Sequence, residues 1–142
     1  MSATNAFETD LLELIFQGLT ITSVAQNAAA PATSLYISLH TADPGETGDQ
    51  TTSEATYTSY ARIAVARDAT GFTVSGSSAT NFAATLFPTC TGGSNIITHF
   101  GIGLSLSGAG TLLLVGSLTT PLLVTNTIAP VFQAGQLVAS VD

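Results

Sequence analysis

The segment SLYISLH, residues 34–40, decides the fold, because apolar and polar side chains alternate along it. Successive side chains of a β-strand point to opposite faces, so Leu35, Ile37 and Leu39 fall on one side of an extended chain. The polar residues between them fall on the other side. This period of two predicts a β-strand with one face toward a hydrophobic core.

The same period recurs along the rest of the chain, in short segments separated by Gly, Pro and Asn. These segments are SYARIAVAR (59–67), GFTVSG (71–76), SATNFAATLF (78–87), NIITHFGIGLSL (95–106), TLLLVGSL (111–118), LLVTN (122–126) and QLVASVD (136–142). With no helical pattern between them, they predict a mainly β fold, a jelly-roll-like β-sandwich of about eight strands over residues 33–142. The residues expected to fill its core from the C-terminal half are Ile102, Leu104, Leu106, Leu113 and Val115.

One α-helix is expected before the strands, over residues 5–17. Asn5 is the expected N-cap, with Glu8 three residues later in the spacing of a capping box, and Gly18 is the expected terminator. The apolar face is expected to consist of Phe7, Leu11, Leu14 and Ile15. The sequence leaves open whether this face packs on its own domain or on a neighbouring chain.

The length and the charge of the chain limit the number of domains and the kinds of partner it can have. A chain of 142 residues fits a single domain, expected here over residues 1–142. Its net charge of −7 opposes attraction to phosphate, so no nucleic-acid partner is expected. Its longest apolar runs are broken by Ser, Thr, Gly and Pro121, so no membrane association is expected. No Asp, Glu, Lys or Arg lies between Asp68 and Asp142, and this half is either a polar uncharged surface or a surface covered in an assembly.

The segment HTADPGETGDQ, residues 40–50, gathers a histidine and three acidic residues. These acids do not have the spacing of a calcium loop, and the Pro and Gly residues forbid a helix that would align them, so no metal is expected. Asp43-Pro44-Gly45 predicts a turn in which the Asp side chain accepts backbone N–H bonds. Cys90 and His99 have no basic or acidic neighbour that would make a nucleophile, so neither catalysis nor a cofactor is expected.

The two arginines, Arg62 and Arg67, are the only strong cations of the chain. For Arg62 the expectation is an ion pair or hydrogen-bond clamp to an acidic residue of the preceding loop, and the alternative is contact with a partner subunit. The loop 42–56 lacks apolar periodicity and is expected to be ordered mainly by a partner. The candidate partner-contact residues are Asp43, Glu46, Asp49, Glu54, Arg62 and Ser117.

Five segments of the chain resemble a known family. They are LYISLHTADPGETG (35–48), SYARIAV (59–65), FPTCTGGS (87–94), ITHFGI (97–102) and FQAGQL (132–137). The chain is similar to small virion proteins of tailed bacteriophages that are labelled tail-fibre or decoration proteins. Within that family it is most similar to the jelly-roll cement type that covers the capsid of a short-tailed phage.

The resemblance implies a structural virion protein and not an enzyme. Such a protein would sit on the outer surface of the capsid and cement neighbouring major capsid subunits. Its partners would be the major capsid protein and itself, as a homodimer. The alternative is a receptor- or carbohydrate-binding module of the tail. Because uncharged strand edges pair readily with other chains, the self-contact is expected to use the charge-free C-terminal half, including Ser117, and not the charged loop.

Overall fold

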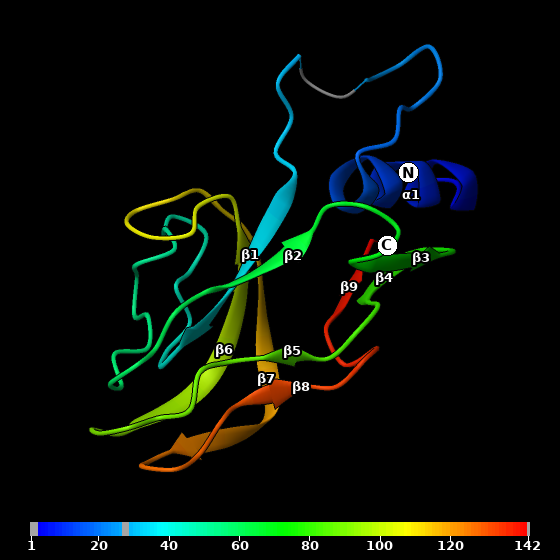
Figure 1. Cartoon of the computed structure of the whole chain (residues 1–142). Helices are drawn as coiled ribbons and strands as arrows, with labels where there is room; N and C mark the ends of the chain where they lie inside the picture. The colour runs from blue at the N-terminus through cyan, green and yellow to red at the C-terminus, as the bar shows by residue number, and fades with distance from the viewer. Residues whose placement is uncertain (1–2, 27–28, 142) are drawn as a thin grey trace. The chain divides into compact units, whose positions relative to one another are not determined.

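The computed structural model describes residues 3–26 and 29–141, which form a mainly β protein with 39% strand and 9% helix (Figure 1). Several antiparallel sheets follow one N-terminal helix, an arrangement consistent with a β-sandwich, and the predicted fold class is confirmed. The described residues form nine strands where about eight were expected. Asp142, the last residue of the final predicted strand, lies outside the described residues.

The strands form sheets of four, three and two members. The four-stranded sheet has the order β2-β1-β6-β7, the three-stranded sheet β3-β4-β9, and the two-stranded sheet β5-β8. The bounds are β1 Ser34–His40, β2 Ile63–Ala66, β3 Phe72–Ser75, β4 Ser78–Asn81, β5 Thr85–Leu86, β6 Asn95–Gly103, β7 Leu112–Val124, β8 Val131–Phe132 and β9 Val138–Ser140.

The chain divides into two compact units, each built from separate stretches of sequence. The helical unit comprises Met1–Ser34, Val65–Thr85 and Phe132–Asp142. The large-sheet unit comprises Leu35–Ala64 and Leu86–Val131. The single domain expected over residues 1–142 stays a prediction.

The N-terminal helix has the predicted extent but a different cap. An α-helix, α1 Asn5–Leu12, continues directly into a π-helical turn, Glu13–Gln17, and Gly18 ends it in the left-handed conformation with φ 70°. The N-cap is Thr4 and not Asn5, because the Thr4 hydroxyl accepts the backbone N–H of Phe7 at 3.4 Å. A threonine hydroxyl satisfies this orphan donor as an asparagine would, one residue earlier.

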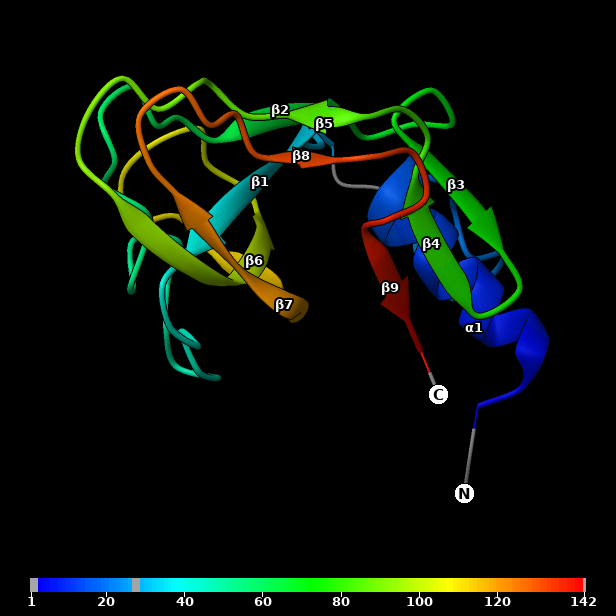
Figure 2. The ribbon, with the colours of Figure 1, turned by 90° about the horizontal axis from the view of Figure 1, so that it is seen from below.

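The helix face that packs inward also differs from the prediction. Glu8, Leu12 and Phe16 are buried, whereas Phe7 is 43% exposed. The Phe16 ring packs against Phe72 of β3 with ring centroids 4.9 Å apart. Figure 2 shows α1 beside β3 and β4 of the same unit. The sequence pattern favoured the stripe with four apolar residues, because the true buried row begins with a carboxylate and therefore did not stand out as apolar.

The Arg67 side chain caps the C-terminal end of the helix. Its guanidinium donates to the carbonyl oxygens of Leu14 and Ile15, the latter at 2.6 Å, and to the carbonyl of Ala32 at 3.3 Å. The last carbonyls of a helix have no partner within the helix, and the negative end of its dipole favours a cation. The sequence did not predict this role for Arg67.

In the large-sheet unit, β1 is a central strand that is buried on both faces. Leu35, Ile37 and Leu39 are buried as predicted, and the alternate residues Ser38 and His40 are completely buried as well. Strand β1 pairs antiparallel with β6 from Tyr36 opposite Gly103 to His40 opposite His99. The polar face of β1 is therefore covered, and the loop that covers it comes from the same chain.

The segments 111–118 and 122–126, predicted as two strands, form the single strand β7, which lies at the edge of the sheet beside β6. The register changes between the pairs His99 with Ser117 and Ile97 with Leu122, so the residues between them form a bulge. Pro121 lies in this bulge. A proline without an N–H is tolerated on an edge strand or in a bulge, and it therefore did not end the strand.

Most of the residues predicted to fill the core from this half do not fill it. Ile102 is buried, but the others are exposed: Leu104, Leu106, Leu113 and Val115. Leu104 and Leu106 follow the last residue of β6, and Leu113 and Val115 belong to the edge strand β7. The alternation predicted strands in this half but could not show that β7, in the described part of the chain, pairs with β6 alone.

Candidate functional site

A buried ion pair joins the loop after β1 to the segment before β2. Arg62 donates from Nε to Glu54 Oε1 at 2.6 Å and from Nη2 to Glu54 Oε2 at 2.8 Å. The Arg62 guanidinium also donates to the carbonyl oxygens of Ser105 and Gly108. The hydrogen bonds to Glu54 raise the pKa of Arg62. The expected clamp is confirmed with Glu54 as its acid, so both candidate contact residues are bonded inside their own unit.

The loop 42–56 is ordered by its own chain, so the expectation that a partner orders it is wrong. Gln50 is completely buried, its Nε2 donates to the Ser105 carbonyl at 3.2 Å, and its Oε1 accepts the Ser105 N–H at 2.8 Å. Asp49 accepts the N–H and the hydroxyl of Thr51, and these hydrogen bonds lower the pKa of Asp49. A loop without apolar periodicity can still be fixed by buried polar contacts.

His40, like Gln50, is a completely buried polar residue. Its Nδ1 lies 2.8 Å from the Thr52 carbonyl oxygen, which can only accept, so Nδ1 carries the proton. Nε2 then accepts from the Ser38 hydroxyl, also at 2.8 Å. Burial lowers the pKa of His40, because the charged imidazolium would lose its hydration. His40 is a structural residue that ties the loop to β1.

We expect the free energy of unfolding to fall as the pH is lowered from about 7 through 6.5, the ordinary histidine value. The pKa of folded His40 is lowered, so below that pH the unfolded chain binds a proton that the folded chain does not. One such proton changes the stability by at most about 1.4 kcal/mol per pH unit. Urea titrations at a series of pH values measure this slope.

The variant His40→Gln should lose this component of the slope, whatever its stability at pH 7. The variant His99→Gln removes the other histidine, retains the His40 bonds and should keep the slope. Equal slopes in the wild type and His40→Gln would contradict the assignment.

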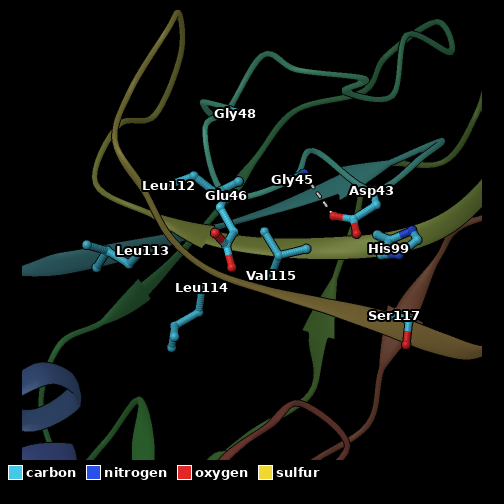
Figure 3. A pocket seen from close by; sticks show the side chains of 10 residues that line it. All are labelled: Asp43, Gly45, Glu46, Gly48, His99, Leu112, Leu113, Leu114, Val115 and Ser117. Atoms are coloured by element: carbon cyan, nitrogen blue, oxygen red, sulfur yellow. Dashed lines mark hydrogen bonds between the residues drawn. The ribbon is translucent and has the colours of Figure 1, made fainter.

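An open groove of about 440 Å³ lies within the large-sheet unit, between the loop after β1 and strand β7 (Figure 3). The loop contributes the exposed carboxylates of Asp43 and Glu46. The strand contributes side chains from Leu112 to Val115 and Ser117, and β6 contributes His99. Asp43 Oδ1 accepts the Gly45 N–H at 2.9 Å, which confirms the predicted turn. The groove therefore has one acidic wall and one apolar wall.

The structure divides the six candidate contact residues into two groups. Asp43, Glu46 and Ser117 line the groove together, although they come from opposite halves of the chain. Asp49 accepts hydrogen bonds from Thr51 within the loop, and Glu54 and Arg62 form the buried ion pair. The contrast between a charged loop and a charge-free half does not hold in space, because this groove is built from both.

Strand β7 exposes a band of apolar side chains, of which Leu113 and Val115 were expected in the core. Leu114 is 38% and Leu123 is 58% exposed, and Leu113, Val115 and Leu122 are exposed as well. The signal in the sequence was the unbroken run Leu112–Val115, which departs from alternation. In the described part of the chain, β7 pairs only with β6, so its other edge keeps unpaired backbone N–H and C=O groups.

Beyond the groove, residues 3–26 and 29–141 carry little that indicates chemistry. No cluster of three or more His, Cys, Asp or Glu side chains there could hold a metal ion. Cys90 is buried, and its thiol lies 3.3 Å from the Gly92 carbonyl oxygen. Within the same residues, no helix is long and apolar enough to span a bilayer.

The fold and the groove define a small antiparallel β protein with an exposed apolar edge strand. The chain belongs to the family described as podophage GP4 fiber I protein gp80, whose model matches residues 2–140. It is thus a structural component of the virion of a short-tailed phage, as the resemblance implied at this level. No curated protein matches the chain.

Proposed function

We propose that the protein binds the outside of the phage capsid and cements neighbouring major capsid subunits. The observation that supports this most is the exposed, uncharged apolar band of β7. Burial of apolar surface stabilises a contact by about 25 cal/mol per Å², and an exposed apolar edge strand in a free protein promotes uncontrolled association. In a protein that functions within an assembly, a neighbouring subunit covers such an apolar strand.

The proposed partners are the major capsid protein and a second copy of the chain. A modest contact made by each of many copies reinforces a shell, because one copy cannot detach without loading its neighbours. A two-fold dimer is the commonest closed arrangement of identical subunits and would let one dimer bridge two shell subunits. In this proposal the protein acts by binding alone and catalyses no reaction.

Particles assembled without the protein test this function. They should form a closed shell but release DNA at a lower temperature than complete particles, because the contacts that resist internal pressure are missing. DNA release can be followed with a dye during a temperature ramp. Addition of the purified protein to the depleted particles should restore the release temperature. Identical release temperatures with and without the protein would contradict the cementing role.

A second candidate function is a tail module that binds a receptor or a carbohydrate, and the family description as a fibre protein favours it. Carbohydrate binding usually needs exposed aromatic rings for stacking. Here Tyr57 is buried, and its ring packs edge-on against Tyr60, which in turn stacks on Phe87. The rings of Tyr57 and Phe87 are buried in the large-sheet unit, and the exposed rings of Phe7 and Phe82 belong to the helical unit. The groove is lined by no Phe or Tyr side chain, so it favours protein contacts over sugar contacts.

A further inference from the structure

The groove between the loop after β1 and strand β7 carries two exposed carboxylates that no lysine or arginine of the described residues neutralises. Asp43 and Glu46 are exposed on its acidic wall. The chain contains no lysine, and its two arginines are bonded within the chain, Arg62 to Glu54 and Arg67 to helix carbonyls. The described residues therefore offer no lysine or arginine that could fill the groove from a second copy.

A second copy in this groove would instead add like charges. Each copy brings Asp43 and Glu46 to the first residues of β7, and like charges placed against each other across an interface cost binding energy. Charge thus selects against a second copy at this place and favours a different protein with basic side chains.

The apolar wall and the strand edge specify the conformation of that partner. The residues Leu112–Ser117 lie on an edge strand, contain no proline and precede the bulge at Pro121. An unpaired edge accepts an extended segment as an additional strand, with main-chain hydrogen bonds for affinity and side-chain contacts for specificity. Beside this edge, the leucine side chains suit apolar residues of the partner, and the carboxylates suit its lysine or arginine.

We propose that the groove binds an extended segment of a different virion protein, in which lysine or arginine alternates with apolar residues. The segment would pair with the free edge of β7 over Leu112–Ser117 and place its cations against Asp43 and Glu46. This deepens the proposed function and rests on it, because it assigns the contact with the capsid protein to one surface. The far end of the strand, Leu122 and Leu123, remains for the second copy.

The test uses phage particles assembled in cells that supply the double variant Asp43→Asn/Glu46→Gln in place of the wild type. The asparagine side chain keeps an oxygen that can accept the Gly45 N–H, so the turn is retained. Particles are washed between about 0.1 and 1 M NaCl, over which the screening length falls from about 10 Å to about 3 Å. Loss of two partly desolvated charge pairs should reduce the copies retained at a given salt concentration on the order of tenfold.

The variant Asp10→Asn/Glu13→Gln makes the same change of charge in the helical unit and should be retained like the wild type. A second variant, Ser117→Lys, places an ammonium group in the groove and should weaken retention as the double variant does. Retention of the groove variants equal to the control would overturn the proposal.

The position of the protein in the same particles separates this inference from the proposed function. Density on the tail alone, with weakened retention of the groove variants, would reject the capsid role and keep the cationic partner. Density on the shell, with unchanged retention of the groove variants, would keep the capsid role and reject the groove as the contact.

Discussion

Replacement of Arg62 by methionine is expected to lower the free energy of unfolding by about 3–5 kcal/mol, the cost of breaking a buried ion pair from one side. The Arg62 side chain is 2% and the Glu54 side chain 16% exposed, so the remaining carboxylate would stay largely buried without its cation. The carbonyl oxygens of Ser105 and Gly108 would lose a donor as well. Denaturant unfolding at pH 7 measures the loss.

Tyrosine signals make this unfolding measurement specific, because the three tyrosines of the chain all lie in the large-sheet unit: Tyr36, Tyr57 and Tyr60. Their fluorescence and near-ultraviolet circular dichroism therefore report on the unit that contains Arg62. The double variant Glu54→Leu/Arg62→Met should recover part of the stability, since it leaves no unpaired charge. If Arg62→Met lowered the free energy of unfolding by less than about 1 kcal/mol, the range of an exposed ion pair, the prediction would be wrong.

Replacement of Phe16 by alanine is expected to destabilise the helical unit by about 3–5 kcal/mol. Phe16 is 1% exposed, and its ring packs against Phe72, so its removal leaves a cavity. Phe7→Ala is the matched control on the same helix, because Phe7 is 43% exposed. Amide hydrogen exchange in β3 and β4 measures the effect in the helical unit.

The control should change protection in β3 and β4 by less than about 1 kcal/mol, as substitutions of exposed side chains usually do. An equal or larger effect of Phe7→Ala would mean that the helix packs on the stripe that the sequence pattern favoured. The pair of variants thus tests the helix register directly.

Local patterns in the sequence predicted the elements that depend on local physics. The alternation of Leu35, Ile37 and Leu39 predicted β1, and the helix over residues 5–17 ends at Gly18 as expected. The clamp formed by Arg62 was also predicted, because few acids lie near it in the sequence and a cation without a partner is costly to bury. Its identity as Glu54 required the structure.

Long-range contacts account for what the sequence did not predict. Gln50 and Ser105 are 55 residues apart, and no local pattern indicates that they bond. The same holds for the groove, whose walls come from residues 43–48 and 112–117. The sequence predicted strands in the region of β7, but only the sheet order shows that this strand lies at an edge. The helix register was wrong because the buried row contains Glu8, a residue type rarely buried.

We propose that this structural virion protein acts on the outer surface of the capsid. The position and copy number of the protein in density from purified virions, determined by electron cryo-microscopy, test it most directly. We predict density for many copies on the outer face of the shell, bridging neighbouring capsid subunits, with the β7 side of the large-sheet unit in contact. Density for a few copies confined to the tail, with none on the shell, would contradict it.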